Sequence, residues 1–164
     1  YRSSERTFQL ITQVAGRAGR ADKKGRVILQ TYSPRHYVFN FGRTYDYEGF
    51  WRKEINTRMV TKFPPFTKVV RVLVAAEEEQ SVVECTREIY RGVRDIESRV
   101  GKFVYLGAAK SPVTRMHGLT RYQVLMRVYP DVYEKIMPEV YALTAKFRPE
   151  RGSCFAETDP QSLI

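Results

Sequence analysis

The sequence has few of the residues that build metal and thiol sites. Its two cysteines, Cys85 and Cys154, stand far apart and outside any Cys-x-x-Cys spacing, and its two histidines are His36 and His117. Four such residues without a paired motif do not predict a zinc site. We expect two buried thiols and no metal site in this chain.

Long apolar runs and known catalytic motifs are missing as well. No stretch reaches the roughly 18 apolar residues of a membrane-spanning helix, and none resembles a signal peptide, so a cytoplasmic protein without membrane contact is expected. There is no Walker A phosphate loop, no G-x-S-x-G and no HExxH. On its own, this chain is predicted to have no catalytic apparatus.

Basic residues are abundant, and they are unevenly distributed. The formal net charge of the 164 residues is +10. Residues 1–66 carry 13 Lys and Arg against 5 Asp and Glu, whereas residues 67–164 carry 15 against 13. A basic surface concentrated in the N-terminal part favours a polyanionic partner.

The stretch QVAGRAGR, residues 13–20, carries the most specific pattern. At 3.6 residues per turn, an apolar stripe lies opposite the face that presents Gln13, Arg17 and Arg20; the stripe consists of Phe8, Ile11, Ala15 and Ala18. Two guanidiniums and an amide on one face suit a polyphosphate. A solvated arginine face that ends in a glycine cap explains the spacing equally well.

The hydropathy pattern predicts an α+β protein in three parts. Residues 5–20 are expected as a helix and 26–32 as a buried strand, after which a short aromatic helix and a helix from 46 to 62 lead to the Pro-Pro of KFPPF. Trp51 is predicted to be largely buried on the apolar face of that helix, with Ile55 and Met59. The expected parts are residues 1–33, 34–66 and 67–164.

The third part, residues 67–164, reads as strand, helix, strand, strand, helix, strand. This order is typical of the βαββαβ split of ferredoxin-like folds. Between the two middle strands, residues 110–121 are expected to form a loop. Its candidate DNA-binding residues are Lys110, Arg115 and Arg121, with Tyr122 beside them as a stacking surface.

These motifs resemble a known family along essentially the whole chain. QVAGRAGR resembles motif VI of superfamily 2 helicases, Q-x-x-G-R-x-x-R. The segments YDYEGFWRKEINTRMVTKFPPF and YLGAAKSP…RYQVLMR, and the Asp-Pro near the C-terminus, are similar to the PriA helicase family. Two departures are Ala108, where the family usually has proline after glycine, and the less aliphatic SCFAET before Asp-Pro.

The resemblance implies the C-terminal part of an ATP-driven 3′→5′ DNA helicase that restarts stalled replication forks by loading the primosome. Residues 1–33 would end a RecA-like helicase lobe, 34–66 would be a helical linker, and 67–164 would resemble ribosomal protein S10. Gln13, Arg17 and Arg20 would take the motif VI positions and bind the nucleotide, and the two arginines would reach the γ-phosphate of an ATP that another part of the parent binds with Mg²⁺. Arg20 would be the arginine finger. The family's zinc-binding cysteines would lie upstream.

Partners implied by the same resemblance are forked or single-stranded DNA, primosome proteins and the single-stranded DNA-binding protein, in the nucleoid region of the bacterial cytoplasm. A competing interpretation is a stand-alone nucleic-acid-binding or scaffolding module with no ATPase linkage. A Walker A motif and a DExx box upstream of Tyr1 in the reading frame would decide for the helicase.

Overall fold

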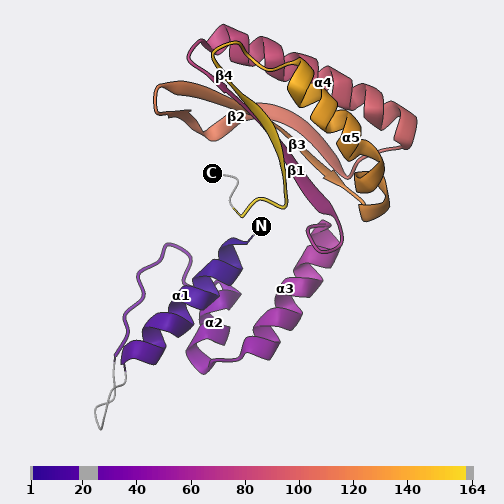
Figure 1. Cartoon of the computed structure of the whole chain (residues 1–164). Coiled ribbons are helices and arrows are strands. Elements are labelled where there is room, and N and C mark those ends of the chain that lie inside the picture. The colour runs from indigo at the N-terminus through magenta and orange to yellow at the C-terminus, as the bar shows by residue number, and fades with distance from the viewer. Residues whose placement is uncertain (1, 19–25, 162–164) are drawn as a thin grey trace. The chain divides into compact units, whose positions relative to one another are not determined.

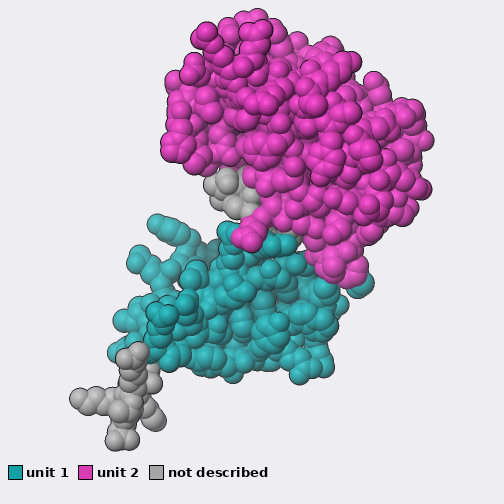
Figure 2. Space-filling model, viewed as in Figure 1, with its two compact units in different colours: residues 1–61 teal, residues 62–164 magenta. Residues whose placement is uncertain are grey.

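A computed structural model describes residues 2–18 and 26–161 of the chain. It divides into two compact units, residues 1–61 and 62–164, coloured separately in Figure 2. Each unit has its own core of buried side chains.

Unit 1 contains three helices, α1 (Ser3–Ala18), α2 (Tyr37–Thr44) and α3 (Tyr47–Thr61) (Figure 1). Phe8, Val38 and Phe50, one from each helix, are buried together. The rings of Phe8 and Phe50 stack nearly parallel, with their centroids 4.4 Å apart and their planes 10° from each other. This small aromatic cluster holds the three helices together.

The face that α3 buries differs from the predicted one. Trp51 is 52% exposed, while its neighbour Phe50 is 4% exposed. One turn after Phe50, the carboxylate of Glu54 is also buried; it accepts a hydrogen bond from the Tyr37 hydroxyl (2.6 Å) and pairs with Arg58 (3.1 Å). The prediction of a buried Trp51 was wrong because a paired, hydrogen-bonded glutamate takes a core position that an apolar pattern does not mark.

The strand expected at residues 26–32 is not a strand. These residues are irregular, and no strand of the described chain pairs with them. Ile28 is 82% exposed and Leu29 48% exposed. An extended segment becomes a strand only when a neighbouring strand takes its backbone hydrogen bonds, and this segment has no such neighbour among the residues described here.

Unit 2 confirms the α+β class. Its elements are β1 (Lys68–Ala76), α4 (Glu79–Val100), β2 (Tyr105–Met116), β3 (Leu119–Val128), α5 (Pro130–Lys146) and β4 (Gly152–Thr158). The four strands form one antiparallel sheet in the order β2-β3-β1-β4. Both helices cover the same face of this sheet (Figure 1).

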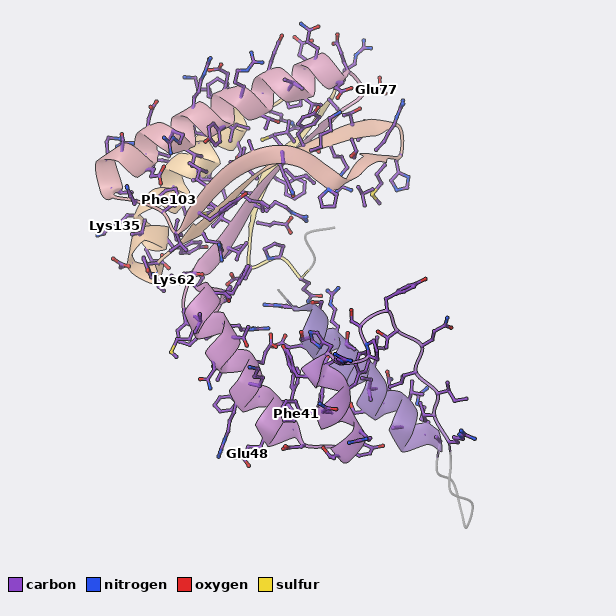
Figure 3. All side chains as sticks on the ribbon, turned by 180° about the vertical axis from the view of Figure 1, so that it is seen from behind. Phe41, Glu48, Lys62, Glu77, Phe103 and Lys135 are labelled. Carbon is purple, nitrogen blue, oxygen red and sulfur yellow. The ribbon has the colours of Figure 1, made fainter. Side chains whose placement is uncertain are left out.

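The core of unit 2 lies between that face and the helices. Val72 of β1, Val124 of β3 and Ile89 of α4 are fully buried there. Phe103, labelled in Figure 3, closes the core from the segment between α4 and β2. Because side chains alternate along a strand, the residues between these core positions point away from α4 and α5, to a side that we call the open face. Its β1 residues, Val69, Arg71, Leu73 and Ala75, are nevertheless buried.

Candidate functional site

The outward face of α1 presents two of the three motif residues. Gln13 and Arg17 are exposed, one helical turn apart, while Phe8 and Ile11 on the opposite side are 6% exposed each. Arg17 makes no ion pair with another described residue, and a Cβ placed at Gly16 would meet no atom within 4 Å. The amide and the guanidinium are therefore free to meet a ligand. Arg20 lies outside the described residues.

An apolar groove lies on another side of α1. Its volume is about 760 Å³. Ile11, Ala15 and Ala18 of α1 line one part of it, and Val27 and Leu29 of the irregular segment line another. Unit 1 therefore keeps apolar surface that its own described residues do not fill.

Residues 110–121 form most of a β-hairpin instead of the expected loop. β2 and β3 extend to a two-residue turn, His117 (φ 52°) and Gly118 (φ 81°), both in the left-handed region. A turn with two positive φ values matches the twist of the flanking strands and makes a tight hairpin. The register shifts between Lys110 and Arg115, which is the one irregularity within the described β2–β3 pairing.

Two of the predicted DNA-binding residues are held by an acidic side chain of α4. Lys110 and Tyr122 are cross-strand partners, and both bind the Glu79 carboxylate, at 3.0 Å and 2.7 Å. The hydrogen bond from Tyr122, and then that from Lys110, lowers the pKa of the Glu79 carboxyl, while the same contact raises the pKa of Lys110. The lysine charge is thus paired with a carboxylate at an exposed site.

The other two predicted residues do not join that cluster. Arg115 is exposed near the end of the hairpin. Arg121 precedes Tyr122 in β3 and so points to the opposite face of the sheet, where its guanidinium contacts the Met116 sulfur at 3.3 Å. The structure therefore separates the predicted set into a Glu79-bound pair and two arginines.

Sequence reasoning missed a group of residues on the open face. Tyr105 is 46% exposed and Phe155 is 43% exposed. Arg71 and Gln123 lie between their strands, on β1 and β3. The signal was present in RYQVLMR, residues 121–127, whose alternate positions hold Arg121, Gln123 and Arg127.

Neither cysteine has the environment of a nucleophile. Both are partly buried beside the core, and burial raises the pKa of Cys85 and raises that of Cys154 to about 11. A thiol that stays protonated is a poor nucleophile and a poor metal ligand. Among the described residues, no three His, Cys, Asp or Glu side chains gather as metal ligands would. No helix in that part of the chain has the length and hydropathy to cross a bilayer.

Comparison with known proteins gives one consistent family. Residues 60–161 match the family described as the primosomal protein N C-terminal domain. Replication restart protein PriA of Bacillus subtilis is 38% identical over 127 residues, which are 77% of this chain and 16% of that protein. The PriA proteins of Rickettsia conorii and of a Synechocystis strain are 36% and 35% identical, over 76% and 84% of this chain and 18% and 16% of theirs.

The chain thus spans less than a fifth of the length of these curated relatives. Among solved structures, the de novo designed protein Foldit4 covers 58% of this chain and 99% of its own, with 14% identity and a TM-score of 0.43. That score is too low to establish a shared fold.

Proposed function

This chain belongs to the primosomal protein N C-terminal domain family, and on that premise we propose that it is the C-terminal part of an ATP-dependent 3′→5′ DNA helicase. In this proposal, the helicase restarts replication at stalled forks by loading the primosome. The family match supports a role in replication restart. The observation that carries the helicase assignment is the exposed pair of Gln13 and Arg17 on α1, opposite a buried apolar stripe.

In this proposal α1 supplies part of an ATP site. Gln13, Arg17 and Arg20 bind the nucleotide, and the two arginines reach the γ-phosphate of an ATP whose Mg²⁺ and phosphate loop belong to another part of the parent protein. Their role is electrostatic: a fixed guanidinium charge beside the transferred phosphoryl group stabilises the charge that develops there. ATP and Mg²⁺ are thus cofactors of the parent, and this chain alone hydrolyses no ATP.

The irregular segment at residues 26–32 supports the same assignment. It is rich in β-forming residues, yet Ile28 and Leu29 stay exposed beside an unfilled apolar groove. We assign residues 1–33 to the end of a RecA-like lobe, where neighbouring strands of the parent would pair with this segment. Residues 34–66 then serve as the linker and residues 67–164 as the domain that resembles ribosomal protein S10.

Unit 2 is proposed to contact DNA and partner proteins. Of the predicted set, Arg115 and Arg121 are not held by Glu79, and Lys110 with Tyr122 would become available on the helix side of the hairpin once that carboxylate is displaced. Forked or single-stranded DNA is the expected ligand, with primosome proteins and the single-stranded DNA-binding protein as partners near the nucleoid. A stand-alone nucleic-acid-binding module, the alternative, would use the same hairpin without any ATPase.

Steady-state ATPase kinetics of the full-length parent test the proposal. Arg17→Ala and Arg20→Ala should each lower DNA-stimulated turnover by a large factor, on the order of 10³ for the finger residue, with ATP binding retained. Arg35→Ala, which removes an exposed arginine outside α1, is the matched control and should leave turnover unchanged. Normal turnover in both motif variants would refute the assignment of α1 to the ATP site.

A further inference from the structure

The open face of the sheet in unit 2 has the residues of a platform for unpaired bases. Tyr105 of β2 and Phe155 of β4 stand on the two edge strands, each nearly half exposed. Their strands lie three strand spacings apart, about 14 Å. Along the strands, Tyr105 is level with Val69 of β1 and Phe155 is level with Leu73. Aromatic side chains on different strands of a four-stranded sheet are the means by which RNA-recognition motifs stack successive bases.

The backbone at Gly107 allows Tyr105 to lie against the sheet. A Cβ added at Gly107 would come within 2.4 Å of the Tyr105 hydroxyl, so the ring extends along β2 over the space that a side chain would fill. The Arg127 guanidinium lies 5.6 Å from the centre of the same ring. The contacts with Gly107 and Arg127 thus hold the Tyr105 ring in place on the sheet.

Between the two aromatic residues, the buried side chains of Arg71 and Gln123 each have one polar atom without a hydrogen-bond partner among the described residues. Arg71 is 7% exposed; its Nε and one terminal nitrogen bind Glu157, and the other, Nη1, makes no hydrogen bond. Gln123 is 5% exposed, and its Oε1 accepts none. Buried polar atoms in folded proteins almost always have partners, so this donor and this acceptor are two places where a bound water or a ligand would complete the hydrogen bonding.

The sheet register places these groups together. Gln123 pairs with Leu73, which pairs with Phe155, so the amide and the phenyl ring share one row across the sheet. Arg71 lies in the adjacent row, level with Gly107. A ligand that stacks on both rings would therefore pass over the two orphaned atoms.

The charges of this face favour an anionic strand. Arg121 and Arg127 lie on it, while Arg71 is buried and paired with the carboxylate of Glu157. Nucleic-acid bases offer donors and acceptors on their edges, flat faces for stacking, and phosphates for the arginines. In a duplex the faces of the bases are occupied by one another, so the arrangement suits a single strand.

We propose that the open face binds single-stranded DNA, with one base stacked on Tyr105, another on Phe155, and the strand between them crossing the rows of Arg71 and Gln123. This inference deepens the proposed function, because it names the form of DNA and the surface that takes it. It involves the face opposite the Lys110–Tyr122–Glu79 cluster.

Fluorescence anisotropy with the 164-residue chain tests the platform. The probe is a labelled oligothymidine of about 12 nucleotides, and a duplex of the same length is the comparison. Tyr105→Ala and Phe155→Ala should each weaken oligothymidine binding about tenfold, with little effect on the duplex and an unchanged salt slope, because no phosphate contact is lost. Tyr105→Phe should restore binding.

Tyr141→Ala is the matched control. Tyr141 is 51% exposed on α5, in the helical layer, and its loss should change nothing. Far-UV circular dichroism verifies that each variant is folded. If folded Tyr105→Ala and Phe155→Ala bind oligothymidine as tightly as the unsubstituted chain, the platform is refuted while DNA binding through the hairpin stands. If the unsubstituted chain binds neither probe, the platform and the proposed DNA contact of unit 2 both fail.

Discussion

Two neighbouring aromatic residues of α3 should differ sharply in their effect on stability. Phe50 is 4% exposed and stacks on Phe8, whereas Trp51 is 52% exposed. Truncating a buried phenylalanine to alanine costs about 3–5 kcal/mol, because apolar contact is lost and a cavity remains. Phe50→Ala should lose that much free energy of unfolding in unit 1, while Trp51→Ala should lose less than about 1 kcal/mol.

The size of unit 1 makes the difference easy to detect. For a domain of 60–100 residues, each kcal/mol shifts the melting temperature by roughly 4–8 °C, so a loss of about 3–5 kcal/mol in Phe50→Ala should lower the melting temperature of unit 1 by roughly 12–40 °C. Urea unfolding followed by far-UV circular dichroism measures both variants, since it does not depend on the tryptophan. In the unsubstituted chain, iodide should quench the fluorescence of Trp51. Equal losses of stability in the two variants would contradict the burial assigned to α3.

Two further predictions concern ionisable groups of unit 2. Burial raises the pKa of Cys154 from about 9 to about 11, so between these pH values the folded state holds a proton that the unfolded state has lost. The contribution of this thiol to stability should therefore be full below pH 9 and be lost as the pH rises through about 11. Cys154→Ala should flatten that decline in alkaline unfolding curves. Glu79→Gln should release Lys110, raising DNA affinity a few-fold at low salt and steepening its salt dependence; an unchanged slope in anisotropy titrations would show that Lys110 makes no phosphate contact.

Much of the fold could be predicted because it depends on local periodicity. The stripe that includes Phe8 and Ile11 marks α1, and the apolar run from Val69 to Ala75 marks β1. Residues 26–32 have the same kind of β-rich composition and yet form no strand. The composition of a segment indicates its β-propensity, whereas a strand also requires a neighbouring strand to pair with, which no local sequence pattern reveals.

The candidate sites also differ in whether local periodicity alone could predict them. Gln13 and Arg17 were placed correctly on the exposed face of α1, because helical spacing alone decides that. The hairpin was mistaken for a loop, since His117-Gly118 is an unusual pair for a two-residue turn. Arg71 was overlooked because it stands in an apolar strand, and its orphaned nitrogen becomes visible only when the register brings Glu157 beside it.

The two proposed contacts lie on units with separate cores, and this makes them separable by mutation. Arg17 is exposed on α1, and Tyr105 and Phe155 are exposed on the sheet, so replacing any of them removes no core packing. In the full-length parent, Arg17→Ala should therefore lower ATP turnover and leave oligothymidine affinity intact. Tyr105→Ala should do the reverse at saturating DNA: turnover is kept, and the DNA concentration that half-activates it rises. Loss of both properties in either variant would mean that the substitution disturbs a structure shared by the two units, contrary to the separate cores seen here.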